Sequence, residues 1–474
     1  MIAALVSAAA ARWGEREALV DDGGGRCSFA ALERRAWQAA GALTTRGIVA
    51  GDRVALVAPN SIDFVAAWLG VTLAGATVVP IPTVSAPPEV AHRLAHARCS
   101  LLLDDAALTE LFQAGGAPPP AAHTTPLPDD APAMILYTSG TTGTAKAAAF
   151  SHASLAIHTA NVARTVGLDE GDVILGTLPL THSFGLRMVM LLGLHTGARV
   201  VLLRRFDAAR ALALADAEGV TFWPAVPTML AAACAADGPR PRALRWVLSA
   251  GAPLPDALCR RAEARLGCEV RQGYGLTEAS FSTIDAPPSA RAIGSVGRAV
   301  EGVTVRIADG EIQVRGPHVT SGYLDDREAT LAAFDDGWLR TGDVGRLDAD
   351  GRLVIVDRTK DLIIRGGNNV YPSEVEAALA AHPAVADVAV IGRPDDYYGE
   401  EVVAVVVPRS VSAATPDLAA ELAEFARARV ASTKVPREYA FVDAMPLGPS
   451  GKVLKRELRR RLLDGGLPTT KPAR

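Results

Sequence analysis

The sequence feature that most constrains the fold is a repeated alternation of short apolar runs with helix-like segments. Residues 52–60 (DRVALVAPN) predict an apolar strand that leads into a capped helix, and residues 78–81 predict the next strand. The same alternation returns over 198–223 and over 244–270. Strands that alternate with helices pair in parallel and are covered by those helices. We therefore predict an α/β fold with parallel-type sheets covered by helices.

The pattern changes after residue 357. The remaining segments predict a small α+β unit of one helix, two strands and two further helices, over 371–382, 385–392, 400–407, 416–430 and 453–463. The whole chain of 474 residues is also longer than one hydrophobic core usually serves. We expect a large N-terminal domain of several subdomains over 1–357 and a small α+β C-terminal domain over 358–474.

Charge and cysteine content argue against several classes of function. The chain has 48 Lys and Arg residues against 52 Asp and Glu residues, so its formal net charge of -4 provides no basic field for nucleic acid. Its five cysteines are scattered, without the spacing of a zinc site or a disulfide framework. We therefore expect no nucleic-acid partner and a reducing, cytoplasmic location.

Two apolar stretches raise the question of a membrane. Residues 64–82 carry no charge and are long enough to span a bilayer, but glycines and prolines interrupt them. Asn60 and Ser61 can cap a helix just before them. We predict a helix followed by a buried strand there, and no membrane span. The opening residues 1–17 lack the basic start of a secretion signal and predict an amphipathic helix.

A loop rich in glycine and hydroxyl side chains follows the apolar strand predicted over 134–137. It runs from Thr138 to Gly143, and Lys146 follows three residues later. Backbone N–H groups and hydroxyls that no bulky side chain blocks can wrap phosphate oxygens. The position of the lysine differs from that in a Walker A loop, and no Ser or Thr follows it to bind magnesium. Taken alone, the loop predicts either a turn or a phosphate cradle.

Five stretches occur together in a specific order: YTSGTTGTAK (137–146), SAGAPL (249–254), QGYGLTEAS (272–280), the segment 341–376 that contains DRTKDLIIRGGNNVYPSEVE, and PLGPSGKVLKREL (446–458). Together they resemble the core motifs of the adenylate-forming superfamily, which contains acyl- and aryl-CoA synthetases, carrier-loading adenylation domains and firefly luciferase. The resemblance covers nearly the whole chain and is strongest to fatty acyl-CoA synthetases. It implies an acid–thiol ligase that uses ATP and Mg2+ to make an acyl-AMP, releases pyrophosphate and passes the acyl group to a thiol, with CoA as the expected acceptor.

The resemblance also implies a nucleotide site. The loop would hold the β- and γ-phosphates through Thr138, Ser139, Gly140, Thr141, Thr142, Gly143 and Lys146. Tyr274 and Ile355 would flank the adenine, with Gly251, Ala252 and Pro253 beneath it, and the nucleotide site would also include Gln272, Gly273 and Gly275. Asp343 and Arg358 would hold the ribose hydroxyls. Each of these residues also has an ordinary structural reading as core, turn or ion pair.

Catalytic and mobile parts follow from the same resemblance. Thr277 would bond the α-phosphate, and Glu278 matches the magnesium ligand, for which a carboxylate oxygen is the suitable donor. Lys452 matches the lysine that contacts the α-phosphate and the acyl carboxylate. Lys360 matches a hinge about which the C-terminal domain turns, which would bring the turn at Gly366 and Gly367 to the thiol step. A surface glutamate and solvated lysines are the alternative readings.

The segment LPLTHSFGL (178–186) resembles the wall of the family's acyl pocket. The pocket residues that this implies are His182, Phe184, Gly185, Trp223, Val226 and Pro227. The segment lacks the aspartate that amino-acid-activating relatives carry, so we expect a largely apolar carboxylic acid. Arg187 either faces the pocket, where it could pair with a second carboxylate, or lies on a helix surface.

Two alternatives to a CoA ligase remain open from the sequence. The acyl group could pass to an acyl carrier protein, an amine or another small nucleophile, because fatty acyl-AMP ligases share the KDLII motif. The chain could also be a noncatalytic nucleotide-binding scaffold. The presence of Glu278, Lys452, Asp343 and Arg358 argues against the scaffold.

Overall fold

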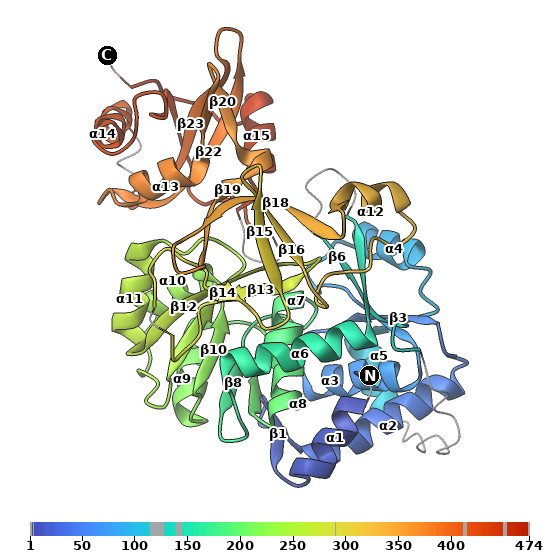
Figure 1. Ribbon diagram of the computed structural model, residues 1–474. Helices are drawn as coiled ribbons and strands as arrows, with labels where there is room; N and C mark the ends of the chain where they lie inside the picture. The colour runs from blue at the N-terminus through green and yellow to red at the C-terminus, as the bar shows by residue number, and fades with distance from the viewer. Residues whose placement is uncertain are drawn as a thin grey trace. The chain divides into compact units, whose positions relative to one another are not determined.

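The computed structural model describes residues 2, 4–113, 128–138, 145–289, 291–410, 415–448 and 453–472 (Figure 1). The chain divides into two compact units. The large unit comprises Met1–Leu254, Leu258–Arg306 and Gln313–Arg340, and the small unit comprises Pro255–Ala257, Ile307–Ile312 and Thr341–Arg474. The boundary predicted at 357/358, with its hinge at Lys360, stays a prediction.

The large unit contains a nine-stranded sheet of order β14-β13-β12-β11-β10-β8-β9-β1-β2. Its strands are β1 (Glu17–Asp21), β2 (Arg26–Ser28), β8 (Val173–Gly176), β9 (Arg199–Leu202), β10 (Phe222–Ala225), β11 (Trp246–Ser249), β12 (Glu269–Leu276), β13 (Ser280–Ile284) and β14 (Arg298–Ala299). From β12 to β1 all neighbouring pairs are parallel, and antiparallel strands flank that core on both sides. The predicted parallel α/β fold is confirmed.

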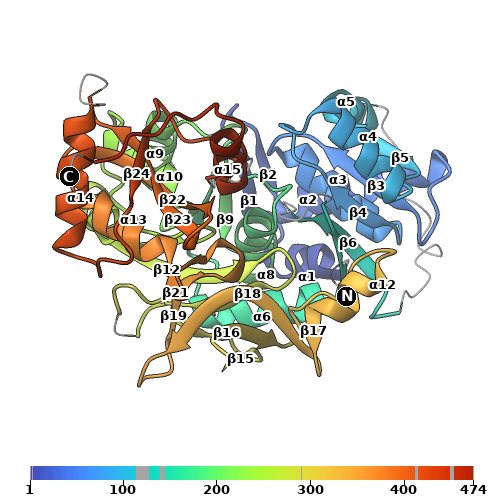
Figure 2. The same ribbon diagram turned by 90° about the horizontal axis from the view of Figure 1, so that it is seen from above.

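A second sheet in the large unit has the order β5-β3-β4-β6-β7. Its strands are β3 (Arg53–Val57), β4 (Thr77–Pro80), β5 (Leu101–Asp104), β6 (Pro132–Tyr137) and β7 (Ala147–Ser151). Only the β6–β7 pair is antiparallel. Figure 2 shows α3 and α5 beside the strands β3, β4 and β5.

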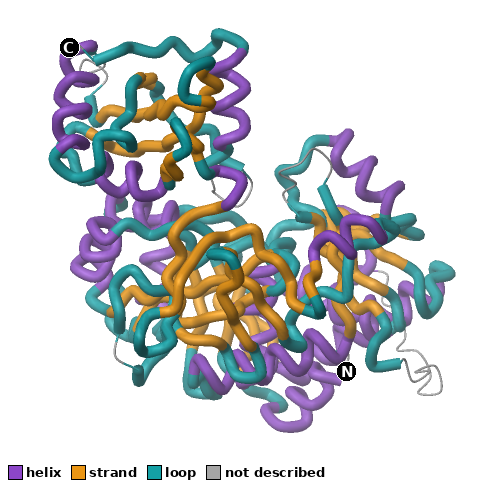
Figure 3. The backbone as a smooth tube through the Cα atoms, turned by 45° about the horizontal axis from the view of Figure 1, so that its top comes forward, coloured by secondary structure: helices purple, strands orange, loops and turns teal. Residues whose placement is uncertain are grey.

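The helices of the large unit cover these sheets (Figure 3). Many buried apolar side chains between the helices and the sheets form one hydrophobic cluster. They are α1 (Ala4–Trp13), α2 (Phe29–Thr45), α3 (Ile62–Leu73), α4 (Pro87–His96), α5 (Asp105–Gln113), α6 (His152–Val166), α7 (Ser183–Gly185), the π-helix η2 (Leu186–Leu191), α8 (Leu192–Thr196), α9 (Ala208–Ala217), α10 (Pro227–Ala235), α11 (Asp256–Leu266) and α12 (Arg327–Ala333).

The apolar stretch over 64–82 forms helix α3 and strand β4, as predicted. The hydroxyl of Ser61 caps α3 by accepting a hydrogen bond from the backbone N–H of Phe64 at 3.0 Å. This bond satisfies one of the N–H groups that a helix start leaves without a partner inside the helix. Within the described parts of the chain, no helix is long and apolar enough to cross a membrane.

The strand order of the nine-stranded sheet reverses between β8 and β10. Strand β9 follows β8 in the chain and pairs on one side of it, whereas β10 pairs on the other side. The chain therefore leaves the carboxyl end of β8 toward β9 and the carboxyl end of β10 toward β11, which are opposite directions along the sheet. In open α/β sheets, ligands bind outside the strand ends at such a reversal.

A further sheet of order β15-β16-β18-β17, with β19 beside β18, follows. Its strands are β15 (Thr304–Ala308), β16 (Glu311–Arg315), β17 (Phe334–Asp335), β18 (Trp338–Leu347) and β19 (Leu353–Arg358).

The small unit carries a sheet of order β21-β20-β23-β22, with β24 beside β23. Its remaining elements are the 3-10 helix η3 (Thr359–Asp361), β20 (Ile363–Arg365), β21 (Asn368–Val370), α13 (Pro372–Ala380), β22 (Val385–Asp395), β23 (Gly399–Pro408), α14 (Pro416–Arg427), β24 (Glu438–Phe441) and α15 (Lys455–Leu463). Alternate residues of β22 and β23 face opposite sides: Val390 packs with α13 and α14, and Ile391 packs with Leu458 of α15. The strands thus have helices on both sides (Figure 3).

Candidate active site

The base of the predicted phosphate loop is a closed pair of backbone contacts. Strands β6 and β7 pair in antiparallel register, with Tyr137 opposite Ala147. Beyond that pair, the N–H of Thr138 donates to the carbonyl of Lys146 at 2.8 Å, and the N–H of Lys146 lies 3.3 Å from the Thr138 hydroxyl. The hairpin therefore fixes where the loop leaves and rejoins the sheet. The loop residues Ser139, Gly140, Thr141, Thr142 and Gly143 lie outside the described residues.

Glu278 lies in the turn of Thr277–Ala279 that joins β12 to β13, and its carboxylate has a specific partner. The hydroxyl of Tyr323 donates to Oε1 of Glu278 at 3.0 Å. Burial, followed by the charge of Glu278, raises the pKa of Tyr323, so the phenol keeps its proton and remains a donor. The ammonium of Lys146 lies 4.9 Å from the centre of the Tyr323 ring. The structure thus brings together the predicted magnesium ligand and the predicted phosphate-binding lysine.

Tyr323 is a site residue that the sequence analysis missed. It lies 45 residues beyond Glu278 in the chain, next to Gly322, and its backbone N–H is held by the Thr330 hydroxyl at 2.9 Å. A glycine–tyrosine pair is too common to predict a catalytic contact, so only the fold identifies it.

The donor set fits a magnesium ion that arrives with phosphates. Within the described residues, no group of three or more His, Cys, Asp or Glu side chains could hold a metal ion by itself. Magnesium usually takes one or two protein carboxylates and completes its shell with phosphate oxygens and water. Glu278, with one oxygen hydrogen-bonded to Tyr323, is a carboxylate of that kind.

Glycines set the shape of the chain around Glu278. A Cβ atom on Gly275 would lie 1.8 Å from the carbonyl oxygen of Ser280, so only glycine permits the close approach of β12 and β13 at this turn. Gly251, after β11, has a φ of +87°, which glycine adopts without strain.

The other predicted adenine-side residues of the large unit differ in exposure. Tyr274 on β12 is 6 % exposed, Gly273 is buried, and Gln272 and Ala252 are half-buried. Pro253 is exposed. The predicted adenine-side residues of the large unit therefore follow or form two adjacent strands.

The predicted acyl-pocket residues gather at the carboxyl ends of β8 and β10, where the strand order reverses. Trp223 is almost fully buried, and its indole N–H donates to the hydroxyl of Thr177 at 2.9 Å. Val226 and Pro227 begin α10, and a Cβ atom on Gly251 would lie 3.5 Å from the Val226 side chain. The predicted acid and nucleotide residues therefore meet at one edge of the sheet.

His182 positions the other wall of this region. Its Nδ1 accepts from the backbone N–H of Phe184 at 3.2 Å and so caps α7. Phe184 packs edge-on against Phe281 of β13, with ring centres 5.0 Å apart. A Cβ atom on Gly185, the last residue of α7, would lie 2.3 Å from the carbonyl oxygen of Pro179, so only glycine fits at this position.

Arg187 does not lie on a helix surface, so that alternative is wrong. The residue is 4 % exposed, and its guanidinium lies 4.4 Å from the centre of the Phe150 ring. Burial lowers its pKa to about 9, so it stays charged at neutral pH.

In the small unit, Asp343 and Arg358 face each other across the β18–β19 hairpin. Nε of Arg358 lies 2.7 Å from Oδ1 of Asp343, and the carboxylate is 5 % exposed. The half-buried Ile355 is on the same strand as Arg358. Both the ribose pair and the predicted adenine contact therefore come from one hairpin.

The remaining predicted residues of the small unit follow that hairpin. Lys360 lies in η3 directly after β19 and is exposed. Gly366 and Gly367 turn β20 into β21 with φ values of 56° and 77°, and the N–H of Gly366 donates to the Tyr398 carbonyl at 2.8 Å. Lys452 lies outside the described residues.

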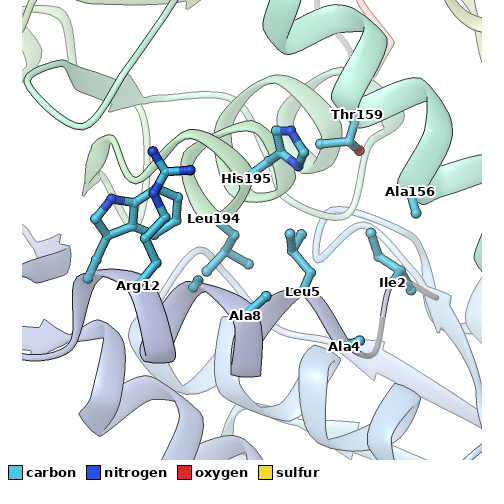
Figure 4. Close-up of a pocket in the computed structure, with 11 residues that line it drawn as sticks. Ile2, Ala4, Leu5, Ala8, Arg12, Ala156, Thr159, Leu194 and His195 are labelled. Atoms are coloured by element: carbon cyan, nitrogen blue, oxygen red, sulfur yellow. The ribbon is translucent and has the colours of Figure 1, made fainter.

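A separate cavity of about 380 Å3 lies between α1, α6 and α8 (Figure 4). Leu5, Ala8 and Leu194 present apolar side chains to it, and Thr159 and His195 are among its few polar neighbours. None of the residues predicted to bind nucleotide or acid lines it, so we place the active site at the strand ends described above.

Comparison with known families agrees with this geometry. The family described as AMP-binding enzyme matches residues 6–324, and the AMP-binding enzyme C-terminal domain matches residues 374–452. The chain is 37% identical to a feruloyl-CoA synthase of Amycolatopsis, over 95% of this chain and 97% of that one. It is 36% identical to a sulfoacetate–CoA ligase of Cupriavidus necator, over 96% and 97% of the two chains.

Solved structures give the same result. ATP-bound MatB from Rhodopseudomonas palustris matches with a TM-score of 0.89 at 30% identity, over 98% of this chain and 99% of that one. O-succinylbenzoate coenzyme A synthetase from Bacillus subtilis, in complex with ATP and magnesium ion, matches with a TM-score of 0.85 at 30% identity, over 96% and 98%. The family matches cover most of the chain and both predicted domains. The chain therefore belongs to the AMP-binding enzyme family and carries that family's C-terminal domain.

Proposed function

We propose that the protein activates a carboxylic acid with MgATP and then transfers the acyl group to the thiol of CoA. In the first step a carboxylate oxygen of the acid attacks the α-phosphorus of ATP, and pyrophosphate leaves. In the second step the thiol attacks the acyl carbon, and AMP leaves. Adenylation replaces a poor leaving group on the acyl carbon by AMP, which makes thiol attack feasible.

The observation that carries the proposal is the contact between Glu278 and Tyr323 beside Lys146. Two negative charges 4 Å apart repel by about 4 kcal/mol at an effective dielectric of 20, so the acid and the triphosphate need cations between them. Lys146 supplies one cation, and Glu278 would hold magnesium through a carboxylate oxygen. Tyr323 fixes the orientation of that carboxylate, so the ligand is positioned before substrates bind.

The acid pocket is proposed at the ends of β8 and β10. Phe184, Trp223 and Val226 give it a largely apolar wall, which suits an apolar acyl or aryl body. The relatives named above are a synthase for feruloyl-CoA and a ligase for sulfoacetate, so similarity alone leaves the acid open. Transfer to CoA is supported by the CoA-ligase names of these relatives.

The remaining predicted roles are part of the same proposal. In the large unit, the loop from Thr138 to Lys146 holds phosphates and Thr277 bonds the α-phosphate. In the small unit, Asp343 and Arg358 hold the ribose, Lys360 is the hinge, and Lys452 stabilises the charge that develops during adenylation.

The test is a pyrophosphate-release assay with a panel of acids, with and without CoA. Glu278→Gln should lower kcat/KM for adenylation about 100-fold or more, because it removes a charged group that acts where charge develops. Glu328→Gln is the matched control, since Glu328 is exposed on α12 and should leave the rate unchanged.

Three outcomes separate the alternatives. Release of pyrophosphate with formation of acyl-CoA supports the proposal. Acyl-AMP that accumulates although CoA is present indicates a carrier protein or another nucleophile as acceptor. No release with any acid points to a noncatalytic nucleotide-binding protein.

A further inference from the structure

Arg187 is a buried cation whose N–H groups find no acceptor among the described residues. It lies on η2, in the segment that follows β8, and it is 4 % exposed. Among the described residues, none accepts a hydrogen bond from its Nε, Nη1 or Nη2, and none forms an ion pair with it. These nitrogens are also closed to solvent. The guanidinium lies 4.4 Å from the centre of the Phe150 ring.

The described side chains near Arg187 are neutral, and several of them can donate a hydrogen bond. Ser183 lies four residues earlier, on the same side of the helix, and its buried hydroxyl also has no hydrogen-bond partner among the described residues. The rings of His158 and His318 are stacked with centres 5.1 Å apart, and His318 Nε2 lies 3.0 Å from the Ser282 hydroxyl. The second nitrogen of His318 and both nitrogens of His158 have no partner in the described chain.

Electrostatics keeps Arg187 the single charge of this cluster. Burial and then Arg187 lower the pKa of His318 to about 3, and burial, His318 and Arg187 hold the pKa of His158 well below its usual range. Both rings are therefore neutral at pH 7, and each carries one N–H that can donate. The cluster consists of one guanidinium and several neutral donors.

Such an arrangement has a high free-energy cost unless an anion binds to it. A buried charge normally has a partner, and leaving one uncompensated costs several kcal/mol. The cation–π contact with Phe150 offsets only part of that cost. Buried unsatisfied groups of this kind are rare in stable folds and concentrate at functional or strained sites.

The cluster adjoins the proposed acyl pocket. Ser183 and Phe184 are neighbours on α7, and Phe184 packs against Phe281 of β13. Ser282, the next residue of β13, holds His318. Helix α7 therefore carries residues of both the apolar wall and the donor cluster, and strand β13, which contacts α7, packs against both (Figure 1 shows the two elements).

We propose that Arg187, with Ser183 and the His158–His318 pair, binds a second acidic group on the substrate, at the end remote from the carboxylate that is adenylated. The substrate class is then an acid with an apolar body and a distal carboxylate or sulfonate. The planar guanidinium suits such a group because it can donate two parallel N–H bonds to its oxygens. Binding requires the side chains around Arg187 to move, because its nitrogens are closed to solvent. This inference rests on the proposed function, because it specifies the acid that the proposed site activates.

The test compares matched acids in the pyrophosphate-release assay. Straight-chain monoacids of increasing length are each paired with the diacid in which a carboxylate replaces the terminal methyl, and toluate is paired with terephthalate. One monoacid–diacid pair should have the length that reaches from the reacting carboxylate to Arg187. For that pair, the wild-type protein should prefer the diacid by about 100-fold or more in kcat/KM, because the monoacid gives the buried donors no acceptor. Arg187→Met should remove or reverse that preference. Arg242→Met is the matched control, since Arg242 is exposed and paired with Asp216.

A binding measurement separates this inference from the proposed function. The fitting diacid should raise the Tm of the wild-type protein and leave that of Arg187→Met unchanged, whether or not pyrophosphate is released. Without ligand, Arg187→Met should match or exceed the wild type in Tm, whereas a purely structural arginine would lower it. Diacid-specific stabilisation without any pyrophosphate release supports the subsite and contradicts the proposed function. Preference for monoacids, or an unchanged preference in Arg187→Met, overturns the subsite, and so does the absence of any diacid-specific Tm shift in the wild type.

Discussion

Two buried arginines of the large unit differ in how their charge is balanced. Arg271 on β12 has a side chain that is 5 % exposed, and it donates to Asp285 at 3.2 Å, to Glu269 at 2.7 Å and to the Ser289 carbonyl at 3.0 Å. Arg187 on η2 is equally buried, but the described residues give it no acceptor. The first arginine is balanced within the fold, and the second needs an anion from outside.

The comparison shows how a binding residue can be distinguished from a structural one of the same type. Burial alone does not separate them, because both guanidinium groups are withdrawn from solvent. The partners decide: Asp285 is itself 4 % exposed, so Arg271 and Asp285 neutralise each other. Around Arg187 the neighbours are neutral histidines, serines and an aromatic ring.

The largest expected difference is in stability. Arg271→Met should lower the free energy of unfolding by about 3–5 kcal/mol, because the buried Asp285 would lose its ion pair with Arg271. Arg187→Met should lower it by little or not at all. Urea unfolding followed by circular dichroism measures both changes. Adding Asp285→Leu to Arg271→Met should restore much of the loss, and a failure to do so would show that the pair is not what Arg271 stabilises.

Acid pH provides a second contrast, because the cluster near Arg187 holds histidines in their neutral form. The folded-state pKa of His318 is about 3, below its ordinary value of 6.5, so the unfolded chain binds more protons between these values. The stability contributed by neutral His318 is present above pH 6.5 and is lost as the pH falls toward 3. The expected loss is about 1.4 kcal/mol per pH unit for this histidine.

Urea unfolding between neutral pH and about pH 5 tests this dependence, where roughly 2 kcal/mol should be lost through His318. Burial is the first cause of the low pKa and Arg187 the second, so Arg187→Met should show a shallower loss. An equally steep loss in Arg187→Met would mean that the arginine does not act on the histidine. Arg242→Met again serves as the control.

The smallest expected effect concerns Tyr323, which orients the carboxylate of Glu278. Tyr323→Phe removes one hydrogen bond to a charged acceptor, worth about 1.5–3 kcal/mol at most, and the carboxylate can find a substitute partner. We expect kcat/KM for adenylation to fall about 10-fold, with the Mg2+ requirement shifted to higher concentration. Tyr397→Phe is a matched control, because Tyr397 is 85 % exposed. An unchanged Mg2+ requirement would show that Tyr323 does not position the ligand.

The sequence by itself determined the layout of the chain. Alternating apolar runs and capping residues such as Ser61 predicted α3 and β4 correctly, because helix and strand periodicities are local properties. The motifs around Lys146 and Glu278 also predicted the family, since their order along the chain is specific. The strand predicted over 78–81 begins and ends one residue earlier, as β4, because strand ends depend on pairing with neighbours.

Only the tertiary structure decided which charges are balanced. Sequence spacing left Arg187 either in a pocket or on a surface, and it gave no sign that Tyr323 contacts Glu278 from 45 residues away. Burial and charge pairing arise when distant segments pack together: α6, β7, η2 and the loop of His318 meet around Arg187. The free energy of a charge depends on those neighbours and on the exclusion of water, which no local pattern of residues records.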